Sequence, residues 1–410
     1  MPVLVQKYGG SSVANAERIR HVAQRVVGLA EQGEQTVVVV SAMGDTTDHL
    51  LAVAREIAPD PDERELDLLL STGETVSMTL LAMALRTLGH PAISLTGAQA
   101  GIRTDSRHRK AVITAVHPGR IRRELDRGRI VIVAGFQGIS EEADVTTLGR
   151  GGSDVTAVAL AVSLGAERCE IYTDVEGVYT ADPRLEPQAQ ILPEIGYEEM
   201  LELATYGARV MHPRAVELGW VYNLPILVAS TFKAGPGTLI HGGAAMEAVN
   251  KVRGIAHDND VARITILGVP DRPGIAAALF EPLAEAGISV DTIVQNSGVN
   301  RVADLSFTVT RDDCPRALRI VDLLARTLGS PEVLSDDALA KVSIVGAGMQ
   351  SAPGYAARMF RTLYEAGINI EMITTSEIRI TCIIALDQVQ EAVRALHGAF
   401  ALERTEEGVT

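Results

Sequence analysis

Short apolar runs of β-strand character alternate with helical segments along the first 230 residues, and this alternation most constrains the fold. The strand-like runs are Val3–Val5, Thr36–Ser41, Ala92–Thr96, Ile130–Phe136, Glu170–Asp174 and Pro225–Ala229, and the helical segments include Ala14–Glu31, Thr72–Leu88 and Asp154–Leu164. Alternation of this kind is typical of a parallel sheet that is covered by helices. We therefore predict an α/β fold for residues 1–235, with an open, mostly parallel sheet and helices on both faces.

Polar and glycine-rich turns follow directly after several of these strands. They are Lys7–Ser12, Ser41–Asp48, Phe136–Ser140 and Asp174–Arg184. In open α/β sheets, ligands bind outside the carboxyl ends of the strands. We therefore expect these four turns to meet over one crevice.

The run Thr147–Asp154, TLGRGGSD, combines three glycines with a cation, a hydroxyl and a carboxylate just before an apolar helix. Glycine lets backbone N–H groups converge on phosphate or carboxylate oxygens, and a helix N-terminus attracts anions. Arg150 can hold an oxyanion with two hydrogen bonds. A second glycine turn, Lys7–Ser12, follows the first strand and supplies a lysine. Together the two turns predict an anion-binding site.

Composition and charge exclude several classes of protein. The formal net charge of −15 disfavours a nucleic-acid or anionic-membrane surface, and the basic cluster Arg103–Lys110 is too short to reverse it. No apolar run reaches the roughly 20 residues that span a bilayer. The three cysteines, Cys169, Cys314 and Cys382, are far apart and indicate neither a disulfide framework nor a zinc site. These features fit a cytoplasmic protein.

The chain changes character after Pro236 and then repeats itself. Residues 236–262 are rich in turns, and we interpret them as a linker. Ile264–Asp291 and Val342–Glu371 align without a gap from the pairs Pro273–Gly274 and Pro353–Gly354 onward. Further strands and helices follow each copy, so we predict two βαββαβ repeats, at 263–335 and 336–410.

An ordered series of motifs resembles the aspartokinases of the amino acid kinase family, and the repeats resemble their paired ACT domains. The series covers nearly the whole chain: VQKYGGSSV, VVSAMGDTTDHL, STGE, GIRTDS, TTLGRGGSD, YTDVEGVYTADPR, GARVMHPRAVE, VPDRPG and TSEIRI. The resemblance implies ATP-dependent phosphorylation of the L-aspartate side chain to 4-phospho-L-aspartate, at the start of lysine, threonine and methionine biosynthesis. It also implies the amino acid kinase fold followed by two ferredoxin-like ACT repeats.

The chemistry of the residues agrees with that activity. A carboxylate acceptor is already ionised at neutral pH, so the reaction needs charge neutralisation and in-line positioning rather than a general base. By analogy, Lys7 contacts the transferring phosphoryl group, and Asp154 anchors either Lys7 or the metal rather than abstracting a proton. Arg150 is expected to hold the substrate α-carboxylate and Glu74 its ammonium group. The other substrate-binding candidates are Ser41, Thr47, Phe136, Gly151, Gly152 and Ser153.

The resemblance also assigns the nucleotide contacts. The candidates are Lys7, Gly9, Gly10, Ser11, Thr173, Asp174, Tyr179, Asp182, Arg184 and Arg209. Magnesium is expected as the ATP complex, with no protein ligands dedicated to it. His212, beside Pro213, is expected to be structural.

ACT repeats bind small amino acids, so the resemblance implies feedback inhibition by lysine, threonine or both. The candidate effector contacts are Asp271, Gly274, Ala276, Gln295, Asn369 and Ile370. Gly274 exposes backbone N–H groups at a helix start, and Asp271 and Gln295 can bind an ammonium or a hydroxyl. We expect a homodimer or larger assembly, and Met246 could start a shorter ACT-only product.

Two departures from the family's pattern stand out. Ala229 replaces a common arginine, and Arg107–Lys110 is more basic than usual. Two alternatives also stay open: a glutamate or N-acetylglutamate kinase of the same fold, and an amino-acid sensor whose kinase half is degenerate. The intact Lys7, Arg150 and Asp154 disfavour the sensor.

Overall fold

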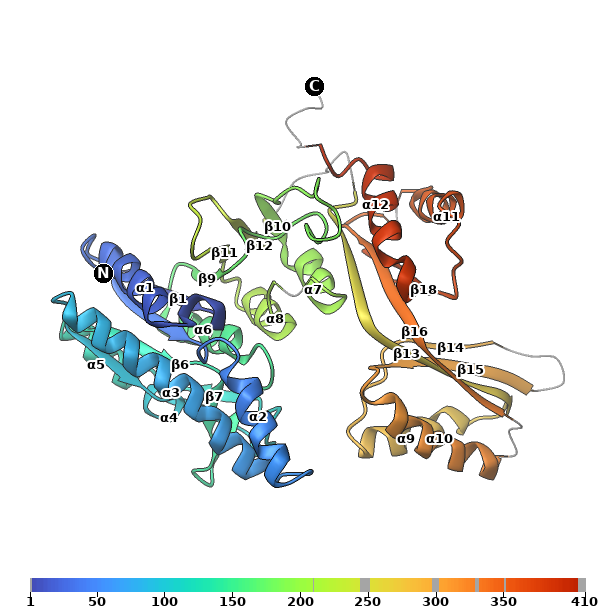
Figure 1. The fold of residues 1–410 in the computed structure, drawn as a ribbon, viewed down its shortest axis with the longest axis horizontal. Coiled ribbons are helices and arrows are strands. Elements are labelled where there is room, and N and C mark those ends of the chain that lie inside the picture. Colours follow the sequence, from blue (N-terminus) through green and yellow to red (C-terminus); the bar gives the residue numbers. More distant parts are fainter. Residues whose placement is uncertain are drawn as a thin grey trace. The chain divides into compact units, whose positions relative to one another are not determined.

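The structure, a computed structural model, describes residues 2–208, 210–243, 251–296, 302–328, 332–349 and 352–404. The chain forms two compact units, which are shown as ribbons in Figure 1. The first unit holds Met1–Tyr179 and Ile191–Ala248, and the second holds Thr180–Gln190 and Val249–Thr410. Arg209 and Met246, both named above, lie outside the described residues.

An eight-stranded sheet forms the centre of the first unit, in the order β10-β12-β11-β9-β1-β2-β6-β3. The strands are β1 (Val3–Tyr8), β2 (Gln35–Val40), β3 (Ala92–Leu95), β6 (Ile130–Ala134), β9 (Cys169–Thr173), β10 (Glu194–Gly196), β11 (Ile226–Ser230) and β12 (Thr238–His241). Every pairing is parallel except that of β11 with β12. The predicted open, mostly parallel sheet is confirmed.

Helices cover this sheet because its strands are apolar on both faces. Helices α1 (Ala16–Ala30) and α3 (Glu63–Thr87) pack with Val38, Val40 and Ile132 in one buried cluster. Helix α6 (Gly152–Leu164) packs on β1 and β2. The remaining helices of the unit are α2 (Thr46–Ile57), α4 (Gly97–Ala100), α5 (Gly119–Asp126), α7 (Tyr197–Thr205) and α8 (Pro213–Val221).

Helix α3 begins nine residues before the predicted Thr72. Asp62 caps it by accepting hydrogen bonds from the backbone N–H groups of Arg64 and Glu65, and Leu66 and Leu70 continue its buried face. Among the described residues, α3 alone is long and apolar enough to cross a membrane by length and composition. Half of it is buried, and it packs on α1, β3 and β6, as a core helix does.

A second, four-stranded sheet in the first unit has the order β5-β4-β7-β8. Its strands are β4 (Ile102–Thr104), β5 (Ile113–Val116), β7 (Gln137–Ile139) and β8 (Val145–Thr147). Strand β8 leads into the glycine turn before α6, and β4 leads into the basic segment Arg107–Lys110. This small sheet therefore brings two cationic turns together.

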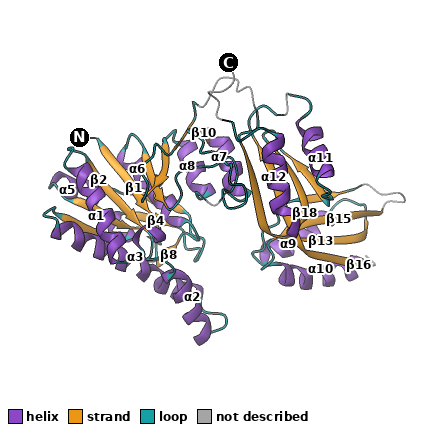
Figure 2. Ribbon diagram, turned by 45° about the horizontal axis from the view of Figure 1, so that its top comes forward, coloured by secondary structure: helices purple, strands orange, loops and turns teal. Residues whose placement is uncertain are grey.

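The described residues of the second unit form a six-stranded sheet in the order β14-β15-β13-β16-β18-β17. Figure 2 labels four of its strands, β13, β15, β16 and β18. Its strands are β13 (Gly254–Pro270), β14 (Ile293–Gln295), β15 (Val302–Val309), β16 (Glu332–Val345), β17 (Met372–Thr375) and β18 (Arg379–Ala385). Its helices are α9 (Ile275–Glu285), α10 (Cys314–Leu328), α11 (Tyr355–Glu365) and α12 (Val389–Ala399). The two predicted repeats are present, and they share this sheet.

The predicted linker 236–262 differs from the structure at both ends. Thr238–His241 form β12 of the first unit's sheet, and β13 already begins at Gly254. Residues 254–258 of β13 pair with residues 341–345 of β16, which belong to the second repeat. The second repeat therefore obtains its last strand from residues upstream of the first repeat. Sequence periodicity missed this because strand pairing between distant segments leaves no local pattern.

Candidate active site

A cavity of about 800 Å³ opens at the carboxyl ends of the strands in the first unit. Its walls come from the turns after β1, β2, β6 and β8, from α2, α3 and the start of α8, and from the basic segment after β4. The lining residues are Lys7, Gly10, Ser41, Ala42, Gly44, Thr47, Asp48, Leu51, Leu70, Glu74, Arg107, Arg109, Lys110, Val112, Phe136, Thr147, Leu148, Gly149, Arg150, Gly151, Gly152, Ser153, His212 and Arg214. Three of the four turns that were expected to meet do so here.

Lys7 and Asp154 form a buried ion pair at the base of this cavity. The Lys7 Nζ atom lies 2.6 Å from Asp154 Oδ1, and the two side chains are only 12% and 7% exposed. The other carboxylate oxygen of Asp154 accepts a hydrogen bond from the His212 backbone N–H at 3.1 Å. Asp154 is thus fixed on both sides and holds the lysine ammonium in place.

The turn after β1 packs closely against the turn after β2. A Cβ atom on Gly10 would lie 2.9 Å from the Ala42 carbonyl oxygen, so a larger residue does not fit. The Gly44 N–H group donates to the Gly10 carbonyl at 3.1 Å. These contacts place glycine backbone beside Lys7, as a phosphate-binding turn requires.

The turn before α6 depends on glycine conformation. Gly149 and Gly151 have φ values of 85° and 75°, in the left-handed region. A Cβ on Gly151 would lie 2.6 Å from the His212 ring, and one on Gly152 would lie 2.7 Å from the Leu148 Cβ. The turn therefore brings the N-terminus of α6 and Ser153 to the cavity, as expected for an anion site.

Glu74 is a buried carboxylate whose position fits the binding of an ammonium group. It is 3% exposed, and its Oε1 atom accepts a hydrogen bond from the Ala42 N–H at 3.1 Å. Its Oε2 atom is buried and has no hydrogen-bond partner among the described residues. Burial raises the pKa of Glu74 to about 7. A bound cation would satisfy the free oxygen and favour the ionised form.

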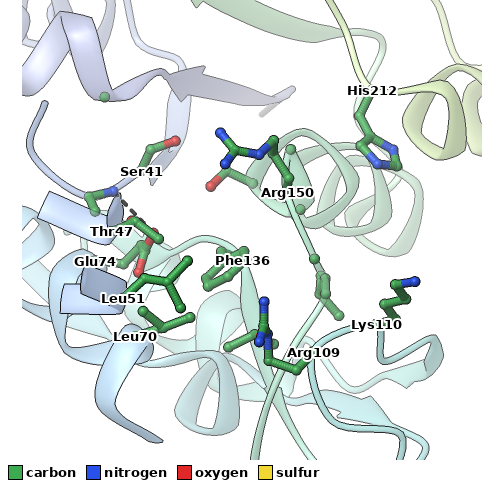
Figure 3. A pocket seen from close by; sticks show the side chains of 18 of the residues that line it. Ser41, Thr47, Leu51, Leu70, Glu74, Arg109, Lys110, Phe136, Arg150 and His212 are labelled. Atoms are coloured by element: carbon green, nitrogen blue, oxygen red, sulfur yellow. Dashed lines mark hydrogen bonds between the residues drawn. The ribbon is translucent and has the colours of Figure 1, made fainter. Parts of the chain in front are cut away.

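Apolar side chains surround Glu74 on the same side of the pocket. Figure 3 shows Thr47, Leu51 and Leu70 near Glu74, with Phe136 next to them. Phe136 has a φ of 67°, and its N–H group donates to the Thr156 hydroxyl at 3.1 Å. A non-glycine residue in the left-handed region is held there by its surroundings, which fixes the Phe136 ring in the pocket wall.

Arg150 lines the cavity but is held only loosely. Its side chain is 89% exposed, and its guanidinium lies 3.4 Å from Asp48 Oδ1. An exposed ion pair of this kind contributes little stability. Arg150 is thus free to turn toward an anionic ligand.

The predicted nucleotide contacts of the first unit lie at the ends of neighbouring strands. Gly9 donates to the Tyr172 carbonyl at 3.1 Å, which joins the turn after β1 to the turn after β9. The Thr173 hydroxyl donates to Asp174 Oδ1 at 3.1 Å, and the Tyr179 hydroxyl lies 3.5 Å from Glu176. Thr173, Asp174 and Tyr179 do not line the cavity itself.

The structure does not bring Asp182 and Arg184 to this cavity. Both lie in Thr180–Gln190, which belongs to the second unit. There the Ile255 N–H group donates to the Thr180 carbonyl at 2.7 Å, and Asp182 accepts hydrogen bonds from Arg184. Their proposed contact with the nucleotide stays a prediction, as does that of Arg209.

Asp67 organises the site and was missed by the sequence reasoning. Its side chain is fully buried and accepts hydrogen bonds from the Thr147 N–H and hydroxyl groups, the Arg109 N–H group and the His108 ring. It thereby ties the basic segment after β4 to the end of β8. Its sequence signal, an aspartate within an apolar stretch of α3, pointed only to a helix.

Three further arginines in the wall, Arg107, Arg109 and Arg214, were also not predicted as site residues. Arg214 donates to the carbonyl oxygens of Leu148 and Ala111 at 2.9 and 3.0 Å, and burial lowers its pKa. The sequence marked Arg107, Arg109 and Lys110 only as part of a segment more basic than the family's pattern, which could alter ligand affinity, and gave them no place in the site. Their role in the cavity becomes visible only once β4 and β8 lie in one sheet.

His212 has the structural role that was expected of it. It precedes α8, and its Nδ1 atom accepts a hydrogen bond from the Arg214 N–H at 3.1 Å. Burial lowers the pKa of the imidazole, so the ring is neutral and can accept this bond. His212 is therefore the N-cap of α8.

Comparisons with known proteins decide the family. Residues 2–230 match the amino acid kinase family, and residues 263–329 and 342–400 each match the ACT domain. The aspartokinase of Mycolicibacterium smegmatis is 50% identical over 416 residues, which cover 100% of this chain and 98% of that protein. The chain belongs to the aspartokinase family. The aspartokinase of Thermus thermophilus is also similar, at 49% identity over 406 residues, with 98% and 100% coverage.

Solved aspartokinase structures share this architecture. The structure of Escherichia coli aspartokinase III in complex with aspartate and ADP covers 97% of this chain, with a TM-score of 0.82 and 27% identity. The same enzyme in complex with lysine and aspartate gives a TM-score of 0.73 and 26% identity over the same share. Each alignment covers 99% of the solved chain. This chain is accordingly an aspartate kinase, and it consists of an amino acid kinase domain and two ACT domains.

The effector candidates of this aspartokinase fall into two groups in the second unit. Asp271, Gly274 and Ala276 lie in and after the turn between β13 and α9, and Gln295 ends the edge strand β14. Gly274 caps α9 with a φ of 93°. Asn369 and Ile370 lie between α11 and β17, and the Asn369 amide donates to Glu371 at 2.9 Å. No hydrogen bond or ion pair among the described residues joins the two groups.

Ala229, where aspartokinases commonly have arginine, is a packed core residue here. It is 6% exposed on β11 and lies opposite Tyr172 of β9. The Arg25 guanidinium of α1 lies 4.0 Å from the centre of the Tyr172 ring. A cation from a helix thus approaches this face of the sheet.

Proposed function

We propose that this protein transfers the γ-phosphoryl group of ATP to the side-chain carboxylate of L-aspartate, giving 4-phospho-L-aspartate. The observation that carries the proposal is the pairing of the Lys7–Asp154 site with the unpartnered Glu74 oxygen in one cavity. The first suits a phosphoryl group and the second suits an amino acid. A related aspartokinase was solved with aspartate and ADP, which supports both assignments.

In this mechanism the chain supplies charge and position. Lys7 neutralises charge on the transferring phosphoryl group, and Asp154 holds Lys7 without accepting a proton. Glycine N–H groups at Gly10 and Gly151 donate to anionic oxygens, and the Gly9, Ser11, Gly152 and Ser153 backbones lie in the same turns. No general base is required because the acceptor carboxylate is already ionised.

The amino acid would lie between Glu74 and Arg150. Glu74 binds the ammonium group, and Arg150 binds the α-carboxylate. Ser41, Thr47 and Phe136 form the walls around it. The side-chain carboxylate then points toward Lys7, in line for phosphoryl transfer.

Magnesium would enter with the nucleotide. Within the described ranges there is no group of three or more histidine, cysteine, aspartate or glutamate side chains that could hold a metal. The metal would be bound mainly by ATP oxygens and water, where it would offset phosphate charge. Thr173, Asp174, Tyr179, Asp182, Arg184 and Arg209 are the proposed contacts to the rest of the nucleotide.

Regulation would act through the ACT repeats. A related aspartokinase was solved with lysine, and we propose that lysine, threonine or both inhibit this protein. The proposed effector contacts are Asp271, Gly274, Ala276, Gln295, Asn369 and Ile370. Inhibition requires that the effector bind one of two conformations more tightly.

The assembly and the cellular setting belong to the same proposal. Exposed edge strands β14 and β17 suit a homodimer or larger assembly. A shorter product from Met246 would contain the ACT repeats alone. The enzyme would act in the cytoplasm at the start of lysine, threonine and methionine biosynthesis.

The experiment is an assay of ADP release with ATP and magnesium. L-Aspartate, L-glutamate and N-acetyl-L-glutamate are compared, each with and without lysine and threonine. The proposal predicts turnover with aspartate alone and suppression by at least one effector. Turnover with glutamate or its acetyl derivative would assign a different acceptor, and amino-acid binding without any turnover would indicate a sensor.

A further inference from the structure

Arg150 lies in a turn that its own side chain does not fix. Its guanidinium is 89% exposed, and among the described residues its one ion pair is that with Asp48, at 3.4 Å. The glycines on either side, Gly149 and Gly151, have φ values of 85° and 75°. Glycine allows many backbone conformations, so such a turn takes its shape from contacts at its ends. The position of Arg150 in the cavity wall therefore depends on what holds the backbone at those ends.

Asp67 of α3 holds the upstream end of this turn. The Thr147 N–H group donates to Asp67 Oδ2 at 2.9 Å, and the Thr147 hydroxyl donates to Asp67 Oδ1. The Thr147 carbonyl accepts a hydrogen bond from the Ala111 N–H group at 3.0 Å. Both Asp67 and Thr147 are fully buried. Each polar group of Thr147 is thus fixed three residues before Arg150.

The other donors to Asp67 come from the basic segment after β4. The Arg109 N–H group donates to both carboxylate oxygens, at 3.1 and 3.0 Å, and the His108 Nδ1 atom donates to Oδ2 at 2.9 Å. A Cβ atom on Gly149 would lie 3.1 Å from the Arg109 carbonyl oxygen, so this segment and the turn are in contact. Asp67 thereby joins α3, the basic segment and the turn into one wall.

A buried carboxylate fixes the position of the groups that donate to it. Taking its charge out of water is costly, and the four hydrogen-bond donors offset that cost. An apolar side chain, such as those of its buried neighbours Leu66 and Leu70, would fill this place without the cost. What the carboxylate adds is a single defined arrangement, because a fully satisfied polar network makes its members rigid.

The phosphate side of the cavity does not depend on Asp67. Lys7 follows β1 and is held by Asp154, which also accepts a hydrogen bond from the His212 N–H group. Within the described chain, the hydrogen bonds of Asp67 reach only Thr147 and the basic segment. Loss of Asp67 should therefore disturb the amino-acid site and spare the nucleotide site.

We propose that Asp67 is a positioning residue for the amino-acid substrate, because it fixes the turn from which Arg150 reaches the α-carboxylate. This inference rests on the proposed function for the role of Arg150. Asp67 does not line the cavity, so it acts through Arg150 and does not touch the substrate.

The test is a double-mutant cycle on the full chain. Calorimetry measures the dissociation constants of L-aspartate and of ADP with magnesium, so the readout does not depend on turnover. Asp67→Asn keeps the shape of the side chain but turns one acceptor oxygen into an NH₂ group that faces a donor. This change is made in wild type and in Arg150→Met. Asp62→Asn is the matched control, because it makes the same change on the same helix, outside the cavity lining, where asparagine is also a good N-cap.

We expect Asp67→Asn to weaken aspartate binding about tenfold in wild type and less than about twofold in Arg150→Met. Its effect on ADP binding should stay below about twofold in both backgrounds. Asp62→Asn should leave both affinities unchanged. Equal losses of aspartate affinity in the two backgrounds, an equal loss of ADP affinity, or no loss at all would overturn the proposal.

Thr147→Val serves if Asp67→Asn does not fold, because it deletes only the hydroxyl that donates to Asp67. It should weaken aspartate binding about threefold in wild type, and Thr147→Ser, which keeps the hydroxyl, should weaken it less. Equal losses from the two variants would contradict the role of Asp67. If wild type binds aspartate but releases no ADP, the proposed function fails, whereas the binding cycle still decides this assignment.

Discussion

Single buried charges decide what the catalytic cavity can bind. Glu74 combines a carboxylate with nearly complete burial, and only one of its oxygens is satisfied within the described structure. Its position in the STGE motif was predictable, but its burial was not, because burial depends on the packing of α3 beneath the turn after β2. Asp67 was missed altogether, because its four hydrogen-bond donors come from segments about 40 and 80 residues away.

The affinity for the amino acid should depend on pH through Glu74. Burial raises the pKa of this carboxyl group to about 7, and only the ionised form binds an ammonium group well. The dissociation constant of L-aspartate should therefore rise by about tenfold per pH unit below pH 7. Calorimetry between pH 5.5 and 8.5 measures it, with Glu74→Gln as the comparison. A wild-type profile as flat as that of Glu74→Gln would contradict this role.

Glu74 should also make the free protein less stable at high pH. Its pKa in the folded state lies above the ordinary value of 4.5, so folding favours the neutral form. This contribution to stability is present below about pH 4.5 and is lost as the pH rises through about 7. Glu74→Gln should consequently be more stable than wild type at pH 8, and the two should converge toward pH 5. Urea unfolding without ligands tests the difference in the free energy of unfolding.

At the level of elements, two ion pairs cross between the ACT repeats at equivalent positions. Arg263 on β13 pairs with Glu371 of the second repeat at 3.1 Å, and Lys341 on β16 pairs with Asp291 of the first repeat. Arg263 and Lys341 precede the aligned strands, and Asp291 and Glu371 end the aligned segments. The internal repeat was visible in the sequence. The ion pairs between the two repeats were not, because they form only when both repeats lie in one sheet.

The two pairs should differ in strength. Lys341 is 7% exposed and among the described residues pairs only with Asp291, whereas Arg263 is 23% exposed and also approaches Asp336 at 3.7 Å. Asp291→Asn should therefore lower the free energy of unfolding of the second unit by about 1–3 kcal/mol, and Glu371→Gln by less than about 1 kcal/mol. Thermal unfolding of both variants compares the two losses of stability. Equal losses, or a larger loss for Glu371→Gln, would contradict this prediction.

At the scale of the whole molecule, the second repeat is completed by a strand from upstream of the first. The fold class, the order of domains and most strands followed from periodicity and motifs. The pairing of residues 254–258 did not follow from them, because the partners, residues 341–345, are more than 80 positions away. Likewise, Thr180–Gln190 reads as a loop of the kinase domain but belongs to the second unit.

This arrangement predicts how fragments of the second unit behave. A fragment that starts at residue 263, the predicted repeat boundary, lacks the strand that covers the inner edge of β16. An exposed strand edge promotes aggregation and costs stability. A fragment that starts at residue 249 keeps this strand and should unfold at a higher temperature. Circular dichroism and light scattering of both fragments test this, and equal stability would contradict the strand assignment.

The most direct test of the catalytic account is to capture the product with hydroxylamine while ADP is measured. The account predicts the β-hydroxamate of L-aspartate in equal amount to ADP. It also predicts that Lys7→Met, which removes the cation held by Asp154, lowers kcat by about 100-fold or more. ADP release without the β-hydroxamate, or a Lys7→Met variant with unchanged kcat, would contradict it.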